Sequence, residues 1–238
     1  MDSQGTRPKV IDHMVMVTAI HEVSPRYRRL TMDSQGLFEF FTPQPAGYLM
    51  INLTDRGSKA QRAYTIHGTT ASSFLLDFVI HDPAGPGSQW ARQATLGTQV
   101  SVTEPLYHVD IPSSSHALII ADTSALPAAA TIVQAFTENV TVILINDDPD
   151  LDTSVLFPGI FDSNPNQANT KKTVVFHQVP ELSTDILRST TATLTPHDCF
   201  LWAAGERNQA KTVREYARQE FQVPRTNQHI QTYWISQN

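Results

Sequence analysis

The sequence predicts two domains of different class: an antiparallel β-barrel over residues 1–112 and a parallel-sheet α/β domain over residues 113–238. Short segments of alternating polarity, separated by turn residues, fill the first half and are typical of antiparallel strands. Continuous apolar runs separated by helical stretches fill the second half and are typical of βαβ units. The Pro/Ser-rich segment 111–115 is the natural seam between the two halves.

Five or six strands are predicted in the first half. They cover residues 14–19, 27–32, 48–54, 62–67, 74–81 and 99–103. In the third strand Leu49, Ile51 and Leu53 share one face, so that face is expected to be buried. Strands at this spacing predict a small antiparallel barrel, interrupted by one short helix around Ser88 to Gln93.

The second half alternates four buried strands with three helices. The strands are expected at 117–120, 141–145, 173–176 and 200–203, and the helices at 125–136, 181–189 and 209–221. In the last helix Ala210, Val213 and Ala217 recur at helical spacing, which indicates an amphipathic helix. Residues 147–170 are rich in Asp, Asn, Pro and Ser and predict a long loop.

The composition excludes several classes of protein. The chain is 40% apolar, enough to build a core, and its 17 basic and 23 acidic residues give a net charge of −6. This charge disfavours a nucleic-acid partner. No apolar run is long enough to insert in a bilayer. Residues 1–10 lack the apolar stretch of a secretory signal, so a cytoplasmic location is expected.

Cys199 is the single cysteine of the chain, which excludes an internal disulfide and any four-cysteine metal cluster. It lies in an apolar run and is expected to be a buried core residue. The nine histidines are scattered without a metal-binding motif, so no metal site is predicted. Redox chemistry in this chain would therefore need an organic cofactor or a partner protein.

Arg62, Tyr64 and Thr65 form the first segment that points to a ligand. On a strand, Arg62 and Tyr64 share one face while Thr65 points to the other. An aromatic ring beside a guanidinium and a hydroxyl can hold a planar, anionic heteroaromatic molecule. The alternative is an ordinary cross-strand aromatic beside a surface arginine.

The segment from His81 to Ala91 contains a strand end, a Gly/Pro turn and a helix start. Exposed N–H groups at the helix start, with Gly87 allowing close approach, would form an anion site. The alternative is that Ser88 is only the N-cap of the helix.

Two further segments leave predicted parallel strands in the same direction. Residues 122–124 follow the first of these strands and residues 203–206 end the last. Ligands of open α/β sheets bind beyond the carboxyl ends of strands, so both segments are candidates for a ligand-binding edge. The G-x-G-x-x-G fingerprint is missing there, and the alternative is a well-capped helix start after Asp122.

The joint order of these segments resembles the siderophore-interacting protein family. The order is Arg-x-Tyr-Thr from 62, His…Gly-Pro-Gly-Ser-x-Trp-Ala from 81, Ala-Asp-x-x-Ala-Leu-Pro-Ala from 121, Trp-x-Ala-Gly-Glu from 202 and Tyr-Trp at 233. The resemblance runs from about Val10 to Trp234. It implies a flavin-dependent ferric-siderophore reductase related to ferredoxin–NADP reductases.

The resemblance also implies roles for individual residues. In the first domain it implies contacts with FAD from Arg62, Tyr64, Thr65, His67, His81, Gly87 and Ser88. In the second, NAD(P)H-binding-like domain it places Asp122, Thr123, Ser124, Gly205 and Glu206 on the side of the electron donor, and Tyr233 and Trp234 near the flavin edge. The implied donor is NAD(P)H or reduced ferredoxin.

His67 departs from the family pattern, because members usually carry a second arginine at this position. An imidazole there is expected to weaken phosphate neutralisation or to shift ligand preference. Lys211, Arg214 and Arg218 recur on one predicted helix and are candidates for binding an anionic ferric siderophore. The alternative for these three is an ordinary solvated helix face.

The predicted function is the FAD-dependent reduction of ferric siderophores, which releases Fe(II) in the cytoplasm for iron assimilation. A flavin suits this reaction because NAD(P)H gives two electrons together and iron accepts one at a time. Two alternatives stay open: a general NAD(P)H-dependent flavin reductase or diaphorase, and a non-catalytic protein that binds flavin or siderophore. The sequence names neither the siderophore nor the donor, and it leaves the oligomeric state open.

Overall fold

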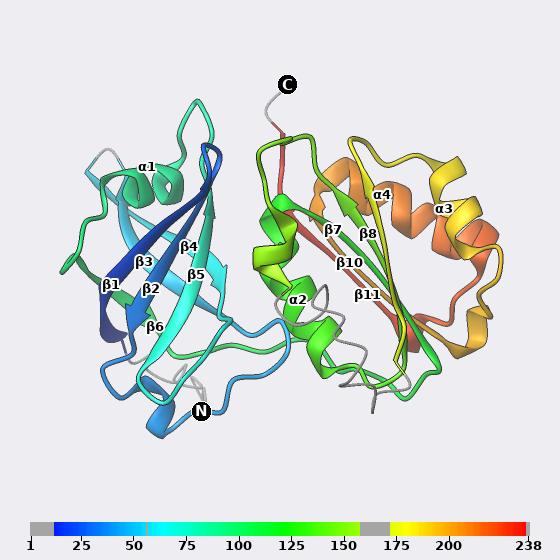
Figure 1. The fold of residues 1–238 in the computed structure, drawn as a ribbon, viewed down its shortest axis with the longest axis horizontal. Helices are drawn as coiled ribbons and strands as arrows, with labels where there is room; N and C mark the ends of the chain where they lie inside the picture. Colours follow the sequence, from blue (N-terminus) through cyan, green and yellow to red (C-terminus); the bar gives the residue numbers. More distant parts are fainter. Residues whose placement is uncertain (1–11, 56, 158–171, 237–238) are drawn as a thin grey trace, which may run out of the picture. The chain divides into compact units, whose positions relative to one another are not determined.

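The computed structural model describes residues 12–55, 57–157 and 172–236. The described chain divides into two compact units (Figure 1). Unit 1 contains the described residues of 1–21, 28–43 and 47–107, and unit 2 contains those of 22–27, 44–46 and 108–238. The chain passes into unit 2 for the last time after Tyr107, shortly before the segment 111–115.

Unit 1 is built on a six-stranded sheet with the order β4-β3-β6-β1-β2-β5. The strands are β1 (Asp12–Ser24), β2 (Tyr27–Asp33), β3 (Tyr48–Asp55), β4 (Ser58–Thr65), β5 (Ser73–Val79) and β6 (Gln99–Thr103). The sheet curls until its two edge strands, β4 and β5, meet at a bridge between His67 and Leu75. There the Leu75 N–H donates to the His67 carbonyl at 2.9 Å. The predicted antiparallel β-barrel is confirmed.

The core of unit 1 lies inside the curled sheet. Leu49, Ile51 and Leu53 are buried, as their alternation along β3 predicts. Full burial of such a side chain contributes about 1.5–3 kcal/mol. Helix α1 (Pro86–Gln93) contacts β3, β4 and β5. Because α1 contacts the strand that carries Arg62 and Tyr64, the core also positions the first candidate site.

A buried ion-pair network joins three parts of this barrel. The Arg29 guanidinium donates from Nε and Nη2 to the two carboxylate oxygens of Asp77, both at 2.8 Å. The imidazole Nε2 of His67 lies 3.2 Å from Oδ1 of the same carboxylate. Burial raises the pKa of Asp77, but the hydrogen bond from Arg29 and the His67 interaction outweigh it and lower that pKa to about 2.

Unit 2 is a parallel five-stranded sheet with the order β11-β10-β7-β8-β9. The strands are β7 (His116–Asp122), β8 (Asn139–Ile145), β9 (Val174–Val179), β10 (Cys199–Glu206) and β11 (Gln228–Trp234), and the helices are α2 (Leu126–Ala135), α3 (Thr184–Thr191) and α4 (Arg207–Tyr216). Figure 1 shows α2 on one face of the sheet and α3 and α4 on the other. The predicted parallel α/β class is confirmed. No described helix is long and apolar enough to cross a membrane.

Unit 2 departs from the sequence predictions in three elements. Strand β11 was not predicted, because its sequence mixes polar and apolar residues as an edge strand can. Strand β9 is also an edge, and its Val175 is 42% exposed where a fully buried strand was expected. The α-helical part of the last helix ends at Tyr216, and a π-helical turn, Ala217–Phe221, follows.

Two further expectations concern Cys199 and a loop. Cys199 is buried as predicted, and burial raises the pKa of its thiol to about 12. The long loop predicted at 147–170 lies partly outside the described residues.

The Asp77 network predicts a loss of stability in acid. The pKa of Asp77 falls from 3.8 to about 2 on folding, so its stabilisation is complete above about pH 4 and is lost as the pH falls towards 2. The shift corresponds to about 2 kcal/mol. Urea unfolding between pH 7 and pH 2.5 should show this loss in the wild type and in the exposed-carboxyl control Glu39→Gln, but not in Asp77→Asn.

Asp77→Asn should itself lower stability at pH 7 by about 3 kcal/mol, because it leaves the Arg29 charge buried without its partner. An equal acid-dependent loss in Asp77→Asn would contradict this assignment. An NMR titration that places the pKa of the Asp77 carboxyl near 4 would contradict it as well.

Candidate functional site

Tyr64 packs between the barrel core and the start of helix α1. Its ring centroid lies 4.3 Å from that of Phe78. A Cβ atom added to Gly87 would lie 1.8 Å from the Tyr64 hydroxyl oxygen, so this approach requires glycine at position 87. Burial raises the pKa of the Tyr64 phenol, which therefore stays protonated at neutral pH. The contact fixes the Arg62–Tyr64 face of β4 beside the first turn of α1.

Arg62 supplies a cation on the same strand, two residues before Tyr64. Its side chain is exposed, and Nη1 donates to the Gln61 carbonyl at 2.8 Å. Among the described residues no carboxylate forms an ion pair with this guanidinium. The first N–H groups of any helix have no acceptor within the helix and attract anions. Arg62 and the start of α1 thus provide two features that can hold a phosphate.

The structure overturns the alternative that Ser88 is the N-cap of helix α1, and contact of Ser88 with a cofactor stays a prediction. Helix α1 begins at Pro86 after the N-cap residue Gly85, so Ser88 is not the cap. The buried Ser88 hydroxyl instead accepts from the His81 N–H at 3.2 Å and so holds the loop 81–87. The backbone N–H groups of Gly87 and Ser88 remain the ones that a bound anion could use. His81 itself is exposed.

Thr65 and His67 lie inside unit 1. Thr65 is 8% exposed and His67 is 7% exposed. The His67 ring faces Asp77, as described above, and its main chain forms the bridge that brings β4 and β5 together. Contacts of these two residues with a cofactor stay a prediction.

The second candidate site is the carboxyl edge of the sheet in unit 2. Strands β7, β8 and β9 follow one another in one direction, whereas β10 and β11 lie on the other side of β7. The strand order therefore reverses between β7 and β10, which is the point where open α/β sheets bind ligands. Asp122 ends β7 and Glu206 ends β10 at this point.

Asp122 holds three chain segments together at this edge. Its Oδ1 accepts from the Ser124 N–H at 2.9 Å and from the Ser124 hydroxyl at 2.6 Å. Its Oδ2 accepts from the Glu206 N–H at 2.9 Å and from the Trp234 indole N–H at 2.7 Å. Burial raises the pKa of Asp122, and these bonds only partly oppose the effect.

Gly205 and Glu206 complete this arrangement. Gly205 has a φ of +153°, and a Cβ atom there would lie 2.6 Å from Asp122 Oδ2, so only glycine fits. The Glu206 carboxylate caps α4 by accepting from the Asn208 and Gln209 N–H groups, and its Oε1 accepts from the Ser236 hydroxyl at 3.0 Å. Burial alone would raise the pKa of Glu206, but these hydrogen bonds lower it.

The structure brings most of the predicted unit 2 residues together. Asp122, Ser124, Gly205, Glu206 and Trp234 form one hydrogen-bonded group or touch it. Thr123 is partly buried beside this group. The sequence did not reveal the Asp122–Trp234 bond, because the two residues are distant in the chain and β11 was not predicted. The one sequence feature that indicates a polar group at this edge is the buried strand β7, which ends in Asp122.

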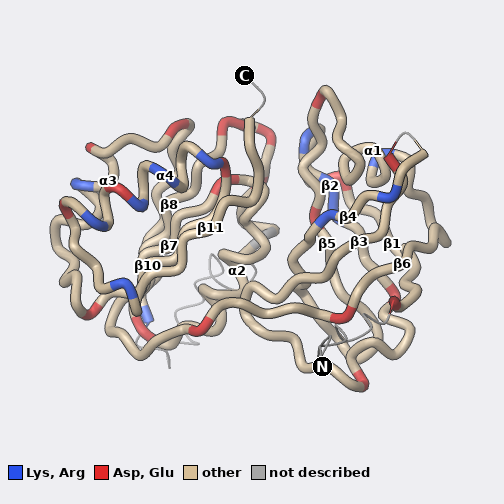
Figure 2. The backbone as a smooth tube through the Cα atoms, turned by 180° about the vertical axis from the view of Figure 1, so that it is seen from behind, with Lys and Arg blue, Asp and Glu red and all other residues tan. Residues whose placement is uncertain are grey.

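The three cations proposed for siderophore binding lie on the exposed side of α4 and the turn after it. Arg214 donates to the Ile230 carbonyl at 2.9 Å, and Lys211 lies 3.9 Å from Glu215. Arg218 is exposed in the π-helical turn. Figure 2 shows basic and acidic positions interleaved over α3 and α4. Their role in substrate binding stays a prediction.

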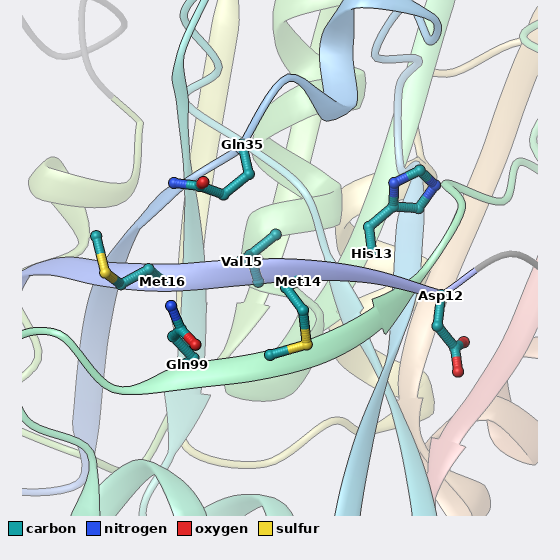
Figure 3. Close-up of a pocket in the computed structure, with 7 residues that line it drawn as sticks. All are labelled: Asp12, His13, Met14, Val15, Met16, Gln35 and Gln99. Atoms are coloured by element: carbon teal, nitrogen blue, oxygen red, sulfur yellow. The ribbon is translucent and has the colours of Figure 1, made fainter.

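A hollow in unit 1 lies away from these residues. It has a volume of about 300 Å³ and is drawn in Figure 3. Its lining residues are Asp12, His13, Met14, Val15, Met16, Gln35 and Gln99. None of them is a predicted site residue, and β6 and β3 separate β1 from β4 in the sheet.

Solved structures of similar fold define the class. The siderophore-interacting protein from Acinetobacter baumannii superposes with a TM-score of 0.73 at 19% identity, covering 94% of this chain and 91% of that one. A ferredoxin NADP+ reductase from Neisseria gonorrhoeae with bound FAD and NADP gives 0.70 at 12% identity, covering 94% and 99%. The fold is that of the ferredoxin–NADP reductase class.

Sequence comparison then identifies the family. Residues 57–109 match the model of the siderophore-interacting FAD-binding domain, and residues 114–237 match that of the siderophore-interacting protein. The chain belongs to the siderophore-interacting protein family.

Two curated relatives illustrate the range of the family. The mycobactin import ATP-binding/permease protein IrtA of Mycobacterium tuberculosis is 29% identical over 232 residues, which are 94% of this chain and 26% of that protein. The ferric acinetobactin reductase of Acinetobacter baumannii is 23% identical over 198 residues, 81% of this chain and 66% of that protein. The chain thus spans about a quarter of the length of IrtA.

Gly87→Ala tests the geometry of the first site. The new Cβ must push the Tyr64 hydroxyl away from α1, so FAD affinity should fall about tenfold or more while the fold is kept. The matched control is Gly85→Ala, because the nearest atom to its new Cβ is 3.9 Å away. Fluorescence titration with FAD measures both variants. Equal FAD affinity in the two variants would show that the Tyr64 contact does not shape the site.

Proposed function

We propose that this chain binds FAD on unit 1 and uses electrons from a nicotinamide nucleotide to reduce the iron of ferric siderophores. The observation that carries the proposal is the joint position of Arg62, Tyr64 and the start of α1. An exposed guanidinium, a fixed aromatic side chain and the first turn of a helix that contacts their strand all belong to the segment that matches the FAD-binding family model.

The residues present fit FAD. The pyrophosphate of FAD is an anion, which suits the Arg62 guanidinium and the N–H groups of Gly87 and Ser88. Gly87 also leaves no side chain between the Tyr64 hydroxyl and α1. Tyr64 can contact the flavin through the part of its side chain that the protein leaves exposed.

Bound FAD would supply the conversion between a two-electron donor and a one-electron acceptor. The chain's own residues would bind FAD and fix its orientation. Arg62 neutralises the phosphates, the hydrogen bond from His81 to Ser88 holds the loop 81–87, and the Asp77 network fixes the end of β4. One NAD(P)H provides electrons for two Fe(III) ions, each of which leaves as Fe(II). Since Fe(II) binds the hard oxygen donors of a siderophore more weakly, reduction loosens the metal.

The names of the relatives support the choice of substrate class. Two of them are called ferric acinetobactin reductase and ferric vibriobactin reductase. The fold neighbour from Neisseria gonorrhoeae holds both FAD and NADP, which supports a nicotinamide donor. Reduced ferredoxin as the donor, release of Fe(II) in the cytoplasm and the identity of the siderophore stay predictions.

An acceptor comparison tests the proposal. The FAD-loaded protein receives NADH or NADPH, and a ferrous chelator traps the Fe(II) formed from ferric catecholate and hydroxamate siderophores. We expect faster turnover on at least one ferric siderophore than on free FMN or a quinone. Equal rates on all acceptors would indicate a general flavin reductase. Flavin that binds but is never reduced would indicate a non-catalytic binding protein.

Arg62→Ala tests the phosphate contact. Loss of the guanidinium should weaken FAD binding about tenfold, because a charge-assisted hydrogen bond contributes about 1.5–3 kcal/mol. Riboflavin lacks the phosphates, so its affinity should change little. Lys59→Ala is the matched control, since Lys59 is an exposed cation on the same strand. Equal weakening of FAD and riboflavin would place Arg62 away from the pyrophosphate.

A further inference from the structure

Trp234 is an exposed aromatic side chain that the protein holds by its polar end. The residue is 46% exposed, whereas its indole N–H donates to a carboxylate that is itself 5% exposed. Because the ring stays largely exposed to solvent, its position contributes little hydrophobic stabilisation. The fixed orientation of the ring therefore needs another explanation. The bond to Asp122 holds the indole at one place on the edge of the sheet.

That place is the point where the strand order of unit 2 reverses. Asp122 ends β7, Gly205 and Glu206 end β10, and Trp234 ends β11. Asp122 Oδ2 joins all three strand ends through the Glu206 N–H and the Trp234 indole N–H. The positive φ of Gly205 lets β10 approach Oδ2 closely enough for this. The exposed ring therefore stands where a ligand of such a sheet binds.

The electrostatics of the group favour a cationic ring. The carboxylates of Asp122 and Glu206 lie at the same edge and are joined through the Glu206 main chain. An indole face attracts cations, and it does so more strongly than a phenyl or phenol ring. Donation of the indole N–H to a carboxylate adds electron density to the ring, which strengthens this attraction.

Hydride transfer from a nicotinamide nucleotide creates such a cation. When the C4–H bond of the dihydropyridine breaks, the hydrogen would leave with both electrons to bound FAD, and a pyridinium ring with one positive charge would remain. We propose that Asp122 is a positioning residue that holds the Trp234 indole as a contact face for this pyridinium ring. The inference rests on the proposed function, and it assigns the donor contact to a specific pair of residues.

If Asp122 had only a structural role, that role would be the hydrogen bonds of its Oδ1 to Ser124. Oδ1 accepts from Ser124 and caps the turn that precedes α2, while Oδ2 alone holds Trp234. Asp122→Asn separates the two roles. If the amide oxygen of this variant keeps the Ser124 bonds, the amide NH₂ group takes the place of Oδ2. This group is itself a donor, so the N–H groups of Glu206 and Trp234 lose their acceptor. Ser124→Ala is the matched control, because it removes a bond to Oδ1 and leaves Oδ2 intact.

Calorimetric titration of the FAD-containing protein tests the contact. The probes are NAD⁺ and NADP⁺, each compared with the corresponding ADP-ribose, which lacks the nicotinamide ring. Trp234→Leu and Asp122→Asn should weaken binding of the oxidised nucleotide about fivefold or more, within the range of a desolvated cation–π contact. Binding of the ADP-riboses should stay within about twofold. Ser124→Ala should resemble the wild type.

An NMR measurement tests the positioning without any redox chemistry. The indole N–H resonance of Trp234, assigned by its loss in Trp234→Phe, should be shifted downfield and protected from exchange in the wild type and in Ser124→Ala. Asp122→Asn should remove both effects. In the Trp234→Phe background, Asp122→Asn should cause no further loss of nucleotide affinity, since the bond that it breaks is already absent.

The two proposals fail in different ways. Nucleotide and ADP-ribose affinities that fall together, or an indole resonance that is the same in Asp122→Asn, would overturn the inference even if the protein reduces ferric siderophores. A wild-type protein that binds NAD⁺ or NADP⁺ no better than the ADP-riboses would overturn it as well. Failure of FAD to bind would overturn the proposed function, and the indole resonance would still report the Asp122–Trp234 bond.

Discussion

The contact of the Tyr64 hydroxyl with Gly87 is the constraint on which the first site depends. It holds β4, the strand that carries the exposed cation of Arg62, against the start of α1. The contact exists because position 87 has no side chain and because Phe78 supports the ring from the core. The Asp77 network holds the same strand at its other end, through His67.

In unit 2 the Asp122 carboxylate fixes neighbouring segments, as the Tyr64 ring does in unit 1. Asp122 is buried, yet both of its oxygens accept hydrogen bonds, from the ends of β10 and β11 and from the turn after β7. A buried acceptor with four donors fixes its neighbours, because releasing any of them would leave a polar group without a partner. The exposed indole of Trp234 owes its orientation to this carboxylate. We regard it as the link between the fold and the proposed donor contact.

Sequence periodicity predicted the two sheets because their core strands are regular. Leu49, Ile51 and Leu53 alternate along β3, and the apolar runs of β7, β8 and β10 are buried on both faces. The edge strand β11 mixes polar and apolar residues without that regularity, so the sequence pattern does not predict it. The order of motifs along the chain predicted the family, which the comparisons show.

Pairings of distant polar residues could not be predicted from the sequence. The buried His67 ring faces Asp77, a partner that lies on strand β5 and that no local motif indicates. Ser88 was a candidate cap, but its hydroxyl holds the His81 main chain. Such outcomes depend on which strands become neighbours, and no local pattern of residues encodes that choice.

An anaerobic absorbance experiment on the FAD-reconstituted protein decides whether unit 1 holds a flavin that passes electrons to ferric siderophores. The account predicts one flavin per chain, bleaching of its yellow absorbance when NADH or NADPH is added, and return of the colour on addition of a ferric siderophore, with Fe(II) trapped by a chelator. A protein that stays colourless in excess FAD would contradict the account. So would bleached flavin that a ferric siderophore leaves unchanged.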